Sequence, residues 1–156
     1  MNRGDAPGNG PCLLTGATGF LGSHIMAELL ARGRRLVIAG RPAGGESLRE
    51  RVLRLLDWFG CGRRPGQLEF LETDFLKPGL GLDAGEYGRL CRRGLPIIHC
   101  ASDTRFAEKN REAVMAANVA GLAGVLELAR RSRARCFHLL SSAYAAGIDF
   151  SDCREA

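Results

Sequence analysis

A glycine-rich turn between an apolar run and a helical pattern constrains this chain more than any other feature. The run Cys12-Leu13-Leu14 leads into Thr15-Gly16-Ala17-Thr18-Gly19-Phe20-Leu21-Gly22, where three glycines recur every third residue. This spacing lets the backbone turn sharply, bring its amides to a phosphate and pack the next helix closely. A helix beginning near Phe20 would point its positive dipole end at that anion. The segment predicts a strand–turn–helix unit that binds phosphate, with an unliganded glycine-rich turn as the alternative.

The composition is that of one ordinary globular domain. The chain has 156 residues, of which 46% are hydrophobic and 25% charged, enough for a real core. No run approaches the roughly 18 apolar residues of a membrane span, and the N-terminus lacks the apolar core of a signal peptide. We therefore expect a cytoplasmic protein without a membrane span.

Cysteine, histidine and arginine are dispersed along the sequence. None of the six cysteines forms a Cys-x-x-Cys pair, so we expect neither a disulfide framework nor a metal site. The net charge of +5 comes almost wholly from arginine. These arginines are not gathered with aromatic residues, a pattern that argues against a nucleic-acid partner and leaves phosphate-rich ligands as candidates.

Strand-like and helix-like segments alternate after an N-terminal tail, residues 1–10, that we expect to be flexible. Strands are expected at 12–15, 35–39, 68–72, 96–100 and 136–141, and helices at 20–32, 47–59, 84–92 and 107–131. This alternation predicts an α/β fold, a Rossmann-like doubly wound parallel sheet in the order 3-2-1-4-5, with ligand bound at the carboxyl ends of the strands.

Two of the expected helices carry further signals. Ser47 and Glu50 form a capping-box pattern at the start of the second helix. In the last helix we expect an inward-facing stripe made of Val114, Ala117, Leu122, Val125, Leu126 and Ala129.

The end of the second strand carries a residue that can select between two nicotinamide cofactors. An NAD-preferring site places an acidic residue here for the ribose 2′-hydroxyl, whereas an arginine can pair with a 2′-phosphate. This chain has Arg41 at that position. The sequence therefore favours NADP(H) over NAD, with an ordinary loop arginine as the alternative.

Other strand ends carry small or polar residues. Asp74 could accept the amino group of adenine while Phe75 covers the ring, although a plain turn aspartate fits the sequence equally well. Cys100, Ala101 and Ser102 are small enough to let the cofactor approach the fourth strand. Ser141 and Ser142 end the fifth strand, where hydroxyls could polarise a bound carbonyl. A serine pair that merely ends a strand is the alternative.

Taken in order, these motifs resemble the extended short-chain dehydrogenase/reductases. The resemblance is carried by the glycine loop, Arg41, Asp74, His99-Cys100-Ala101, Asn118-Val119-Ala120-Gly121 and Ser141-Ser142-Ala143-Tyr144. Thr73-Asp74-Phe75-Leu76-Lys77-Pro78-Gly79-Leu80-Gly81-Leu82 and residues 142–147 look most like the branch of thioester reductases and fatty acyl-CoA reductases. The resemblance covers residues 11 to about 147.

This resemblance implies hydride transfer from NADPH to an acyl thioester, held by a carrier protein or by CoA in the full-length parent, giving an aldehyde or an alcohol. Ser142 matches the catalytic Ser/Thr of the family, which hydrogen-bonds the substrate carbonyl, and Ser141 is its neighbour. Asn118 is carried over as a structural residue.

One motif of the family is missing. Its Tyr-x-x-x-Lys pair has no match, because Cys91 follows Tyr87 at that spacing and Ile148 follows Tyr144. We therefore expect residues 11–156 to be an incomplete domain, truncated after the fifth strand and nearly inert alone. Two alternatives stay open: part of a sugar-nucleotide epimerase or dehydratase, or a non-catalytic dinucleotide-binding module.

Overall fold

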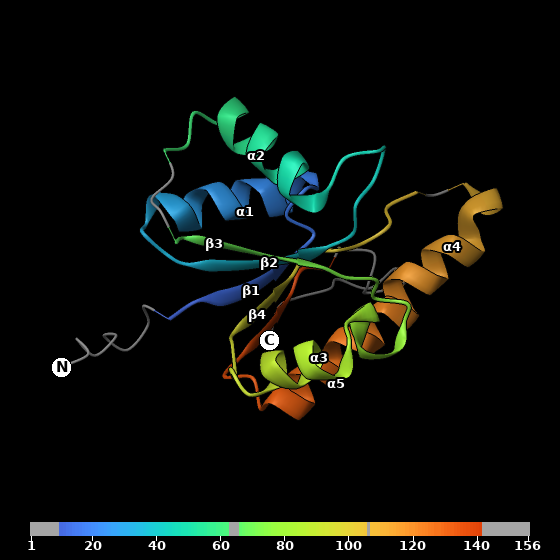
Figure 1. The fold of residues 1–156 in the computed structure, drawn as a ribbon. Helices are drawn as coiled ribbons and strands as arrows, with labels where there is room; N and C mark the ends of the chain where they lie inside the picture. Colours follow the sequence, from blue (N-terminus) through green and yellow to red (C-terminus); the bar gives the residue numbers. More distant parts are fainter. Residues whose placement is uncertain (1–9, 63–65, 106, 142–156) are drawn as a thin grey trace, which may run out of the picture.

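A computed structural model describes residues 10–62, 66–105 and 107–141. Its centre is a parallel sheet whose strands are β1 (Cys12–Thr15), β2 (Leu36–Gly40), β3 (Leu68–Glu72), β4 (Ile97–His99) and β5 (Phe137–Leu139). The strand order is β3-β2-β1-β4-β5, and every neighbouring pair is parallel (Figure 1). The predicted fold class and strand order are confirmed.

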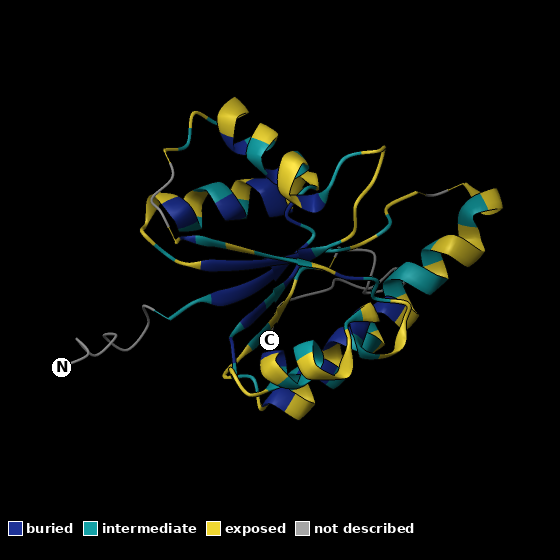
Figure 2. Cartoon of the chain, viewed as in Figure 1, coloured by how far each residue is buried: buried dark blue, intermediate teal, exposed yellow. Residues whose placement is uncertain are grey.

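Helices cover both faces of the sheet. On one face lie α1 (Phe20–Ala31) and α2 (Leu48–Trp58), and on the other lie α3 (Ala84–Cys91), α5 (Leu122–Ser132) and the short 3₁₀ turn η1 (Pro78–Gly81) (Figure 1). Alternate strand residues feed two separate cores. Leu14 and Ile38 pack under α1 and α2, whereas Leu13 and Val37 pack under α3 and α5. Figure 2 shows strands β1 and β2, which are almost wholly buried and dark blue, between these two helical layers.

Polar caps fix where two helices begin. The predicted capping box is present at α2, where Ser47 Oγ accepts from the Glu50 amide at 3.2 Å and Glu50 Oε2 accepts from the Ser47 amide at 2.8 Å. A second capping box, formed by Asp83 and Glu86, starts α3. Each box satisfies backbone N–H groups that a helix start leaves without intrahelical partners.

The last helical stretch is not a uniform α-helix. It runs through the 3₁₀ turn η2 (Glu108–Asn110), α4 (Arg111–Met115), the π-helical turn η3 (Ala116–Gly121) and α5. Gly121, Val125, Leu128 and Ser132 are buried along it, whereas Leu126 is 46% exposed. The predicted inward position of Leu126 is wrong, because an α-helix turns Leu126 by about 100° from its buried neighbour Val125.

The same stretch bears on the expectation of no membrane span. Residues Glu108–Ser132 form a helix with a window of mean hydropathy 1.4, long and apolar enough to cross a bilayer by length and composition alone. Its alanines and glycines raise the mean hydropathy without forming a continuous run of large apolar side chains. In the structure, Val125 and Leu128 of this helix belong to the core beneath the sheet.

Candidate functional site

A pocket of about 570 Å³ opens at the carboxyl ends of the strands, where the fold predicts a ligand. Several chain segments that are distant in sequence line it. They are the glycine loop (Gly16, Ala17, Thr18, Gly19), the end of β2 (Ala39, Gly40, Arg41, Ala43), α2 (Leu48, Arg51), the end of β3 (Thr73, Asp74, Phe75, Leu76), the β4–α4 loop (Cys100, Ala101, Ser102, Asp103, Thr104, Arg105) and the π turn (Ala117, Gly121).

Two glycines of the loop sit where no side chain fits. Gly16 has a φ of +70°, and a Cβ on it would lie 2.5 Å from the Ala101 amide nitrogen. A Cβ on Gly22 would lie 2.1 Å from the Gly16 carbonyl oxygen. Gly22 therefore lets α1 approach the backbone of the loop at Gly16 and Ala17. The turn can take only this shape with glycine at both positions.

The start of α1 is open toward the pocket side of the loop. Its N-cap is Gly19, no side chain caps it in the described part of the chain, and its first turn has no acidic residue. The side chains of Phe20 and Leu21 are 80% and 57% exposed. Phe20, Leu21 and Gly22 are not among the pocket-lining residues described. Their predicted part in binding therefore rests on backbone N–H groups, which the first turn of a helix leaves free for an anion.

A buried polar contact joins the loop to β4. Thr15 Oγ1 lies 2.9 Å from His99 Nδ1 and accepts from the Ala101 amide at 3.2 Å. The His99 ring lies between Phe75 and Phe137, with both centroids 6.2 Å away. Burial lowers the pKa of His99, so its neutral form is favoured. These bonds hold the Ala101 backbone against Gly16.

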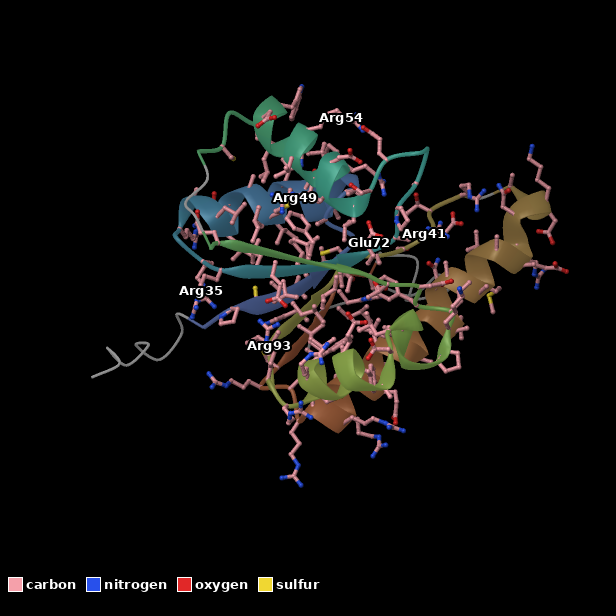
Figure 3. All side chains as sticks on the ribbon, viewed as in Figure 1. Arg35, Arg41, Arg49, Arg54, Glu72 and Arg93 are labelled. Carbon is pink, nitrogen blue, oxygen red and sulfur yellow. The ribbon has the colours of Figure 1, made fainter. Side chains whose placement is uncertain are left out.

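Two arginines lie at the β2 end of the pocket. Figure 3 shows Arg41 just beyond β2, at the end of the sheet that also carries Glu72. Arg51, from the first turns of α2, donates from Nη1 to the Arg41 carbonyl oxygen and from Nη2 to Thr18 Oγ1, both at 3.1 Å. Both acceptors are neutral oxygens. The arrangement can therefore offer two guanidinium groups to one anionic group.

The β3 end of the pocket is shaped by a tight turn. Asp74 Oδ1 accepts from the Leu76 amide at 3.1 Å, and Lys77 Nζ is 3.8 Å from Asp74 Oδ2. Phe75 lies in the core cluster under the sheet while also lining the pocket. The Asp74 carboxylate therefore holds its own turn, and within the described part of the chain its second oxygen lies nearest to the exposed Lys77.

The β4–α4 loop is clamped from the π turn. Asn118 Oδ1 accepts from the Asp103 amide at 2.7 Å, and Asn118 Nδ2 donates to the Asp103 carbonyl oxygen at 2.9 Å. The Asp103 carboxylate binds the Arg105 guanidinium, which holds the pKa of Asp103 at about 2. Asn118, expected to be structural, thus fixes one wall of the pocket.

The remaining predicted residues fall into three groups. Cys100, Ala101 and Ser102 line the pocket at the end of β4, and burial raises the pKa of the Cys100 thiol to about 11. Ser141 is exposed just after β5 and is not among the pocket-lining residues described. Ser142 lies outside the described residues.

Arg51 is a site residue that the sequence reading missed. It stands four residues after the Ser47 cap, so it belongs to the first turns of the helix that follows β2. In an α/β sheet that part of a helix lies at the carboxyl edge of the strands. The capping-box pattern of Ser47 and Glu50 marks the start of this helix. It therefore also indicates that Arg51 lies near the carboxyl edge of the sheet. Thr73, Asp103 and Arg105 were also missed as pocket residues; Thr73 directly follows a correctly predicted strand.

Comparisons with known proteins agree with this geometry. The terminal R domain of the myxalamid PKS-NRPS biosynthetic pathway superposes with a TM-score of 0.73 at 31% identity, over 85% of this chain and 34% of that chain. A UDP-glucose-4-epimerase from Stenotrophomonas maltophila, with a TM-score of 0.66 over 91% of this chain and 39% of that one, is 20% identical and shares the fold alone.

Curated relatives are large synthases and a reductase. Nonribosomal peptide synthetase asaC of Aspergillus flavus is 30% identical over 91% of this chain, which corresponds to 14% of the synthetase. Human fatty acyl-CoA reductase 2 is 28% identical over 85% of this chain and 28% of its own length. The chain thus spans less than a third of the length of each of these two relatives. The family model described as male sterility protein matches residues 14–156, and the chain therefore belongs to this family of NAD(P)-binding domains.

Proposed function

We propose that this chain is the NADP(H)-binding portion of a reductase that transfers hydride from NADPH to an acyl thioester carried by a carrier protein or by CoA. The observation that carries the cofactor choice is the pairing of Arg41 with Arg51 on one wall of the pocket. Both guanidinium groups can bind a 2′-phosphate, which NADPH has and NADH lacks.

The described residues fit the rest of such a cofactor. Gly16 and Gly22 carry no side chain at the two tightest points of the loop, and the uncapped start of α1 offers N–H groups to a pyrophosphate. Ala101 and Ser102, which have small side chains, line the pocket just after β4. The bound nicotinamide would supply the hydride; this chain's residues bind and orient it.

The proposed reaction consumes one hydride and one proton for each thioester reduced to an aldehyde. Hydride adds to the thioester carbonyl carbon, the carbon–sulfur bond breaks, and the thiol leaves with a proton while the acyl group becomes an aldehyde. A second hydride transfer would give the alcohol. Ser142 is the residue proposed to hydrogen-bond the carbonyl oxygen, and the proton donor is proposed to be the family's tyrosine, for which this chain offers no Tyr-x-x-x-Lys match.

Titration of the chain with NADPH and NADH tests the cofactor proposal. The chain should bind NADPH about 10- to 100-fold more tightly, which is the range for one or two charge-assisted hydrogen bonds. Arg41→Ala should remove most of this preference, whereas Arg54→Ala, on the exposed face of α2, should keep it. Equal affinity of the unmodified chain for both cofactors contradicts the assignment.

Assays of a longer protein that contains this chain test the reaction. Incubation with NADPH and an acyl thioester should release free thiol and aldehyde in equal amounts while NADPH is oxidised. A longer protein that binds NADPH but interconverts sugar nucleotides, or that oxidises no NADPH with any acyl thioester, contradicts the proposed reaction and leaves the cofactor assignment standing.

A further inference from the structure

A buried polar pair, Thr15 on β1 and His99 on β4, lies where the two loops of the pocket meet. Thr15 is 0% exposed and His99 is 3% exposed, and neither is among the pocket-lining residues described. The residues that follow them, Gly16 and Ala101, do line the pocket. A Cβ on Gly16 would lie 2.5 Å from the Ala101 amide nitrogen, so the glycine loop and the β4–α4 loop are in contact here.

The hydroxyl group of Thr15 has one proton and two partners. Its oxygen accepts from the Ala101 amide at 3.2 Å and lies 2.9 Å from His99 Nδ1. An amide N–H can only donate, so the hydroxyl proton is free for Nδ1, which accepts it when the imidazole is neutral and protonated on Nε2. We assign this tautomer to His99, because the other one would leave the Thr15 proton without an acceptor among the described residues.

Protonation of His99 would break this arrangement. Nδ1 would become a donor, and the Thr15 hydroxyl proton would lose its acceptor inside the core. The ring lies between Phe75 and Phe137, with both centroids 6.2 Å away. An imidazolium here would exchange water for two apolar rings, which is why burial lowers the pKa of His99.

Other titratable groups lie on the segments around this ring. Tyr87 and Cys91 of α3 pack in the same half of the core. Asp74 follows β3 and Asp103 follows β4, and both carboxylates accept hydrogen bonds from backbone amides. Tyrosine, cysteine and aspartate side chains titrate outside the range of about pH 5–7 in model peptides. A change of charge at this point within that range therefore belongs to His99.

We propose that His99 is a positioning residue for the bound dinucleotide. Its neutral ring accepts the Thr15 hydroxyl proton, which keeps the hydroxyl oxygen on the Ala101 amide and holds the glycine loop against the β4–α4 loop. This inference rests on the proposed NADP(H) function, because these two loops are the proposed walls of the cofactor site. Binding of the dinucleotide and protonation of His99 then oppose each other, so the affinity falls as His99 takes up a proton.

The pH dependence of dinucleotide affinity tests the proposal. NADP⁺ and NAD⁺ are each titrated into the unmodified chain, His99→Asn and His138→Asn at about pH 5.5 and about pH 7.5. Asparagine offers an amide oxygen near the place of Nδ1 and takes up no proton. Between these two pH values the unmodified chain should lose about three- to tenfold more affinity for both ligands than His99→Asn, the value of one hydrogen bond.

Two controls separate His99 from other titrating groups. His138 is exposed on the neighbouring strand β5, so His138→Asn should keep the pH dependence of the unmodified chain. The 2′-phosphate of NADP⁺ titrates near about pH 6, but it does so with every variant, and NAD⁺ lacks it. A pH dependence that is equal in the unmodified chain and in His99→Asn overturns the proposal while the cofactor function stands.

Removal of the hydrogen bond from either side gives a second test. His99→Leu and Thr15→Val should each weaken both ligands by about three- to tenfold at about pH 7.5. The double variant should bind within about twofold of the weaker single variant, because both substitutions remove the same bond. Thr15→Ser keeps the hydroxyl group and should restore binding. Fully additive losses would mean that the two side chains only fill space, and would overturn the proposal.

Nitrogen-15 NMR of the histidine rings tests the tautomer without any ligand. At about pH 7.5, Nδ1 of His99 should give the signal of an unprotonated nitrogen and Nε2 that of a protonated one. A proton on Nδ1 overturns the proposal even where a variant fails to fold. If the unmodified chain binds neither dinucleotide, the proposed function and this inference fail together.

Discussion

Arg51 ties the second helix to the glycine loop through Thr18, whose hydroxyl oxygen accepts from its guanidinium at 3.1 Å. The same side chain also bonds the Arg41 backbone. These contacts hold a long, flexible cation in one orientation before any ligand arrives, so less conformational entropy is lost when an anion binds. The proposed binding of a phosphate group here would therefore use both arginines.

Replacement of Arg51 should weaken the phosphate-bearing cofactor selectively. Arg51→Leu is expected to lower NADPH affinity by about tenfold and to change NADH affinity by less than twofold, because one charge-assisted hydrogen bond to the 2′-phosphate is lost. Isothermal titration calorimetry measures both affinities. Arg54→Leu, in the same helix but paired with Glu46 outside the pocket, is the matched control. An equal loss for NADPH and NADH would show that Arg51 supports the loop rather than the phosphate.

A methyl group at Gly22 should destabilise the whole domain. The added Cβ meets the Gly16 carbonyl oxygen at 2.1 Å, and neither backbone segment can move without opening the loop. Gly22→Ala should lower the free energy of unfolding by about 2–4 kcal/mol in urea. Gly62→Ala, where a Cβ meets nothing within 4 Å, should change it by less than about 0.5 kcal/mol. Similar effects of the two substitutions would contradict the close approach of α1 to the loop.

Loss of the Asn118 side chain should loosen the β4–α4 loop. Asn118→Ala removes both hydrogen bonds to the Asp103 backbone, so amide exchange in residues 102–105 should become faster and NADPH binding weaker. Hydrogen–deuterium exchange followed by mass spectrometry measures the first effect. Val119→Ala, at a 55% exposed residue of the same π turn, is the control and should leave exchange unchanged. Unaltered exchange in Asn118→Ala would mean that other contacts hold the loop.

His99 should make the free energy of unfolding depend on pH in a range above that in which the carboxylates titrate. Burial lowers its folded-state pKa below 6.5, so the unfolded chain binds more protons and stability falls as pH drops below about 6.5. Carboxylates such as Glu127, whose pKa is lowered to about 2 from 4.5, add stability that is lost only below about pH 4.5. Between about pH 6.5 and pH 4.5, His99→Asn should reduce the fall in the free energy of unfolding. For one proton this fall is at most about 1.4 kcal/mol per pH unit.

Urea unfolding at half-unit steps of pH measures this slope. His24→Asn, at an exposed histidine on α1, serves as the control and should keep the decline. A decline that persists unchanged in His99→Asn would assign the pH dependence to another group.

Local sequence patterns predicted most of the fold. Cys12–Thr15 and Leu68–Glu72 form strands with the predicted bounds, because each is a short apolar or alternating run ended by turn residues. The fifth strand was predicted as 136–141 but ends at Leu139. Strand ends depend on pairing with a neighbour, and here the neighbour β4 itself ends at His99. Periodicity alone does not contain that information.

The candidate site was only partly predictable for a similar reason. Arg41 and Asp74 follow strands directly, so topology alone brings them to one edge of the sheet. Arg51 reaches the pocket through a helix, and the partners of its guanidinium depend on what surrounds it in three dimensions. Leu126 was misplaced because the apolar pattern of its helix is wider than the stripe that contacts the sheet. The roles of the predicted site residues stay predictions until ligand titrations are done.

The π turn at Ala116–Gly121 amounts to an inserted residue in an otherwise regular helix. Deletion of Ala120 would let the segment close into ordinary α-helical geometry and would rotate everything before it by about 100° relative to α5. The Asn118 amide would then point away from Asp103, while Val125 and Leu128 would keep their places beneath the sheet. The length of this helix thus sets where the Asn118 side chain lies along the pocket wall. The loss or gain of one residue there should displace that wall while the packing of α5 beneath the sheet stays intact.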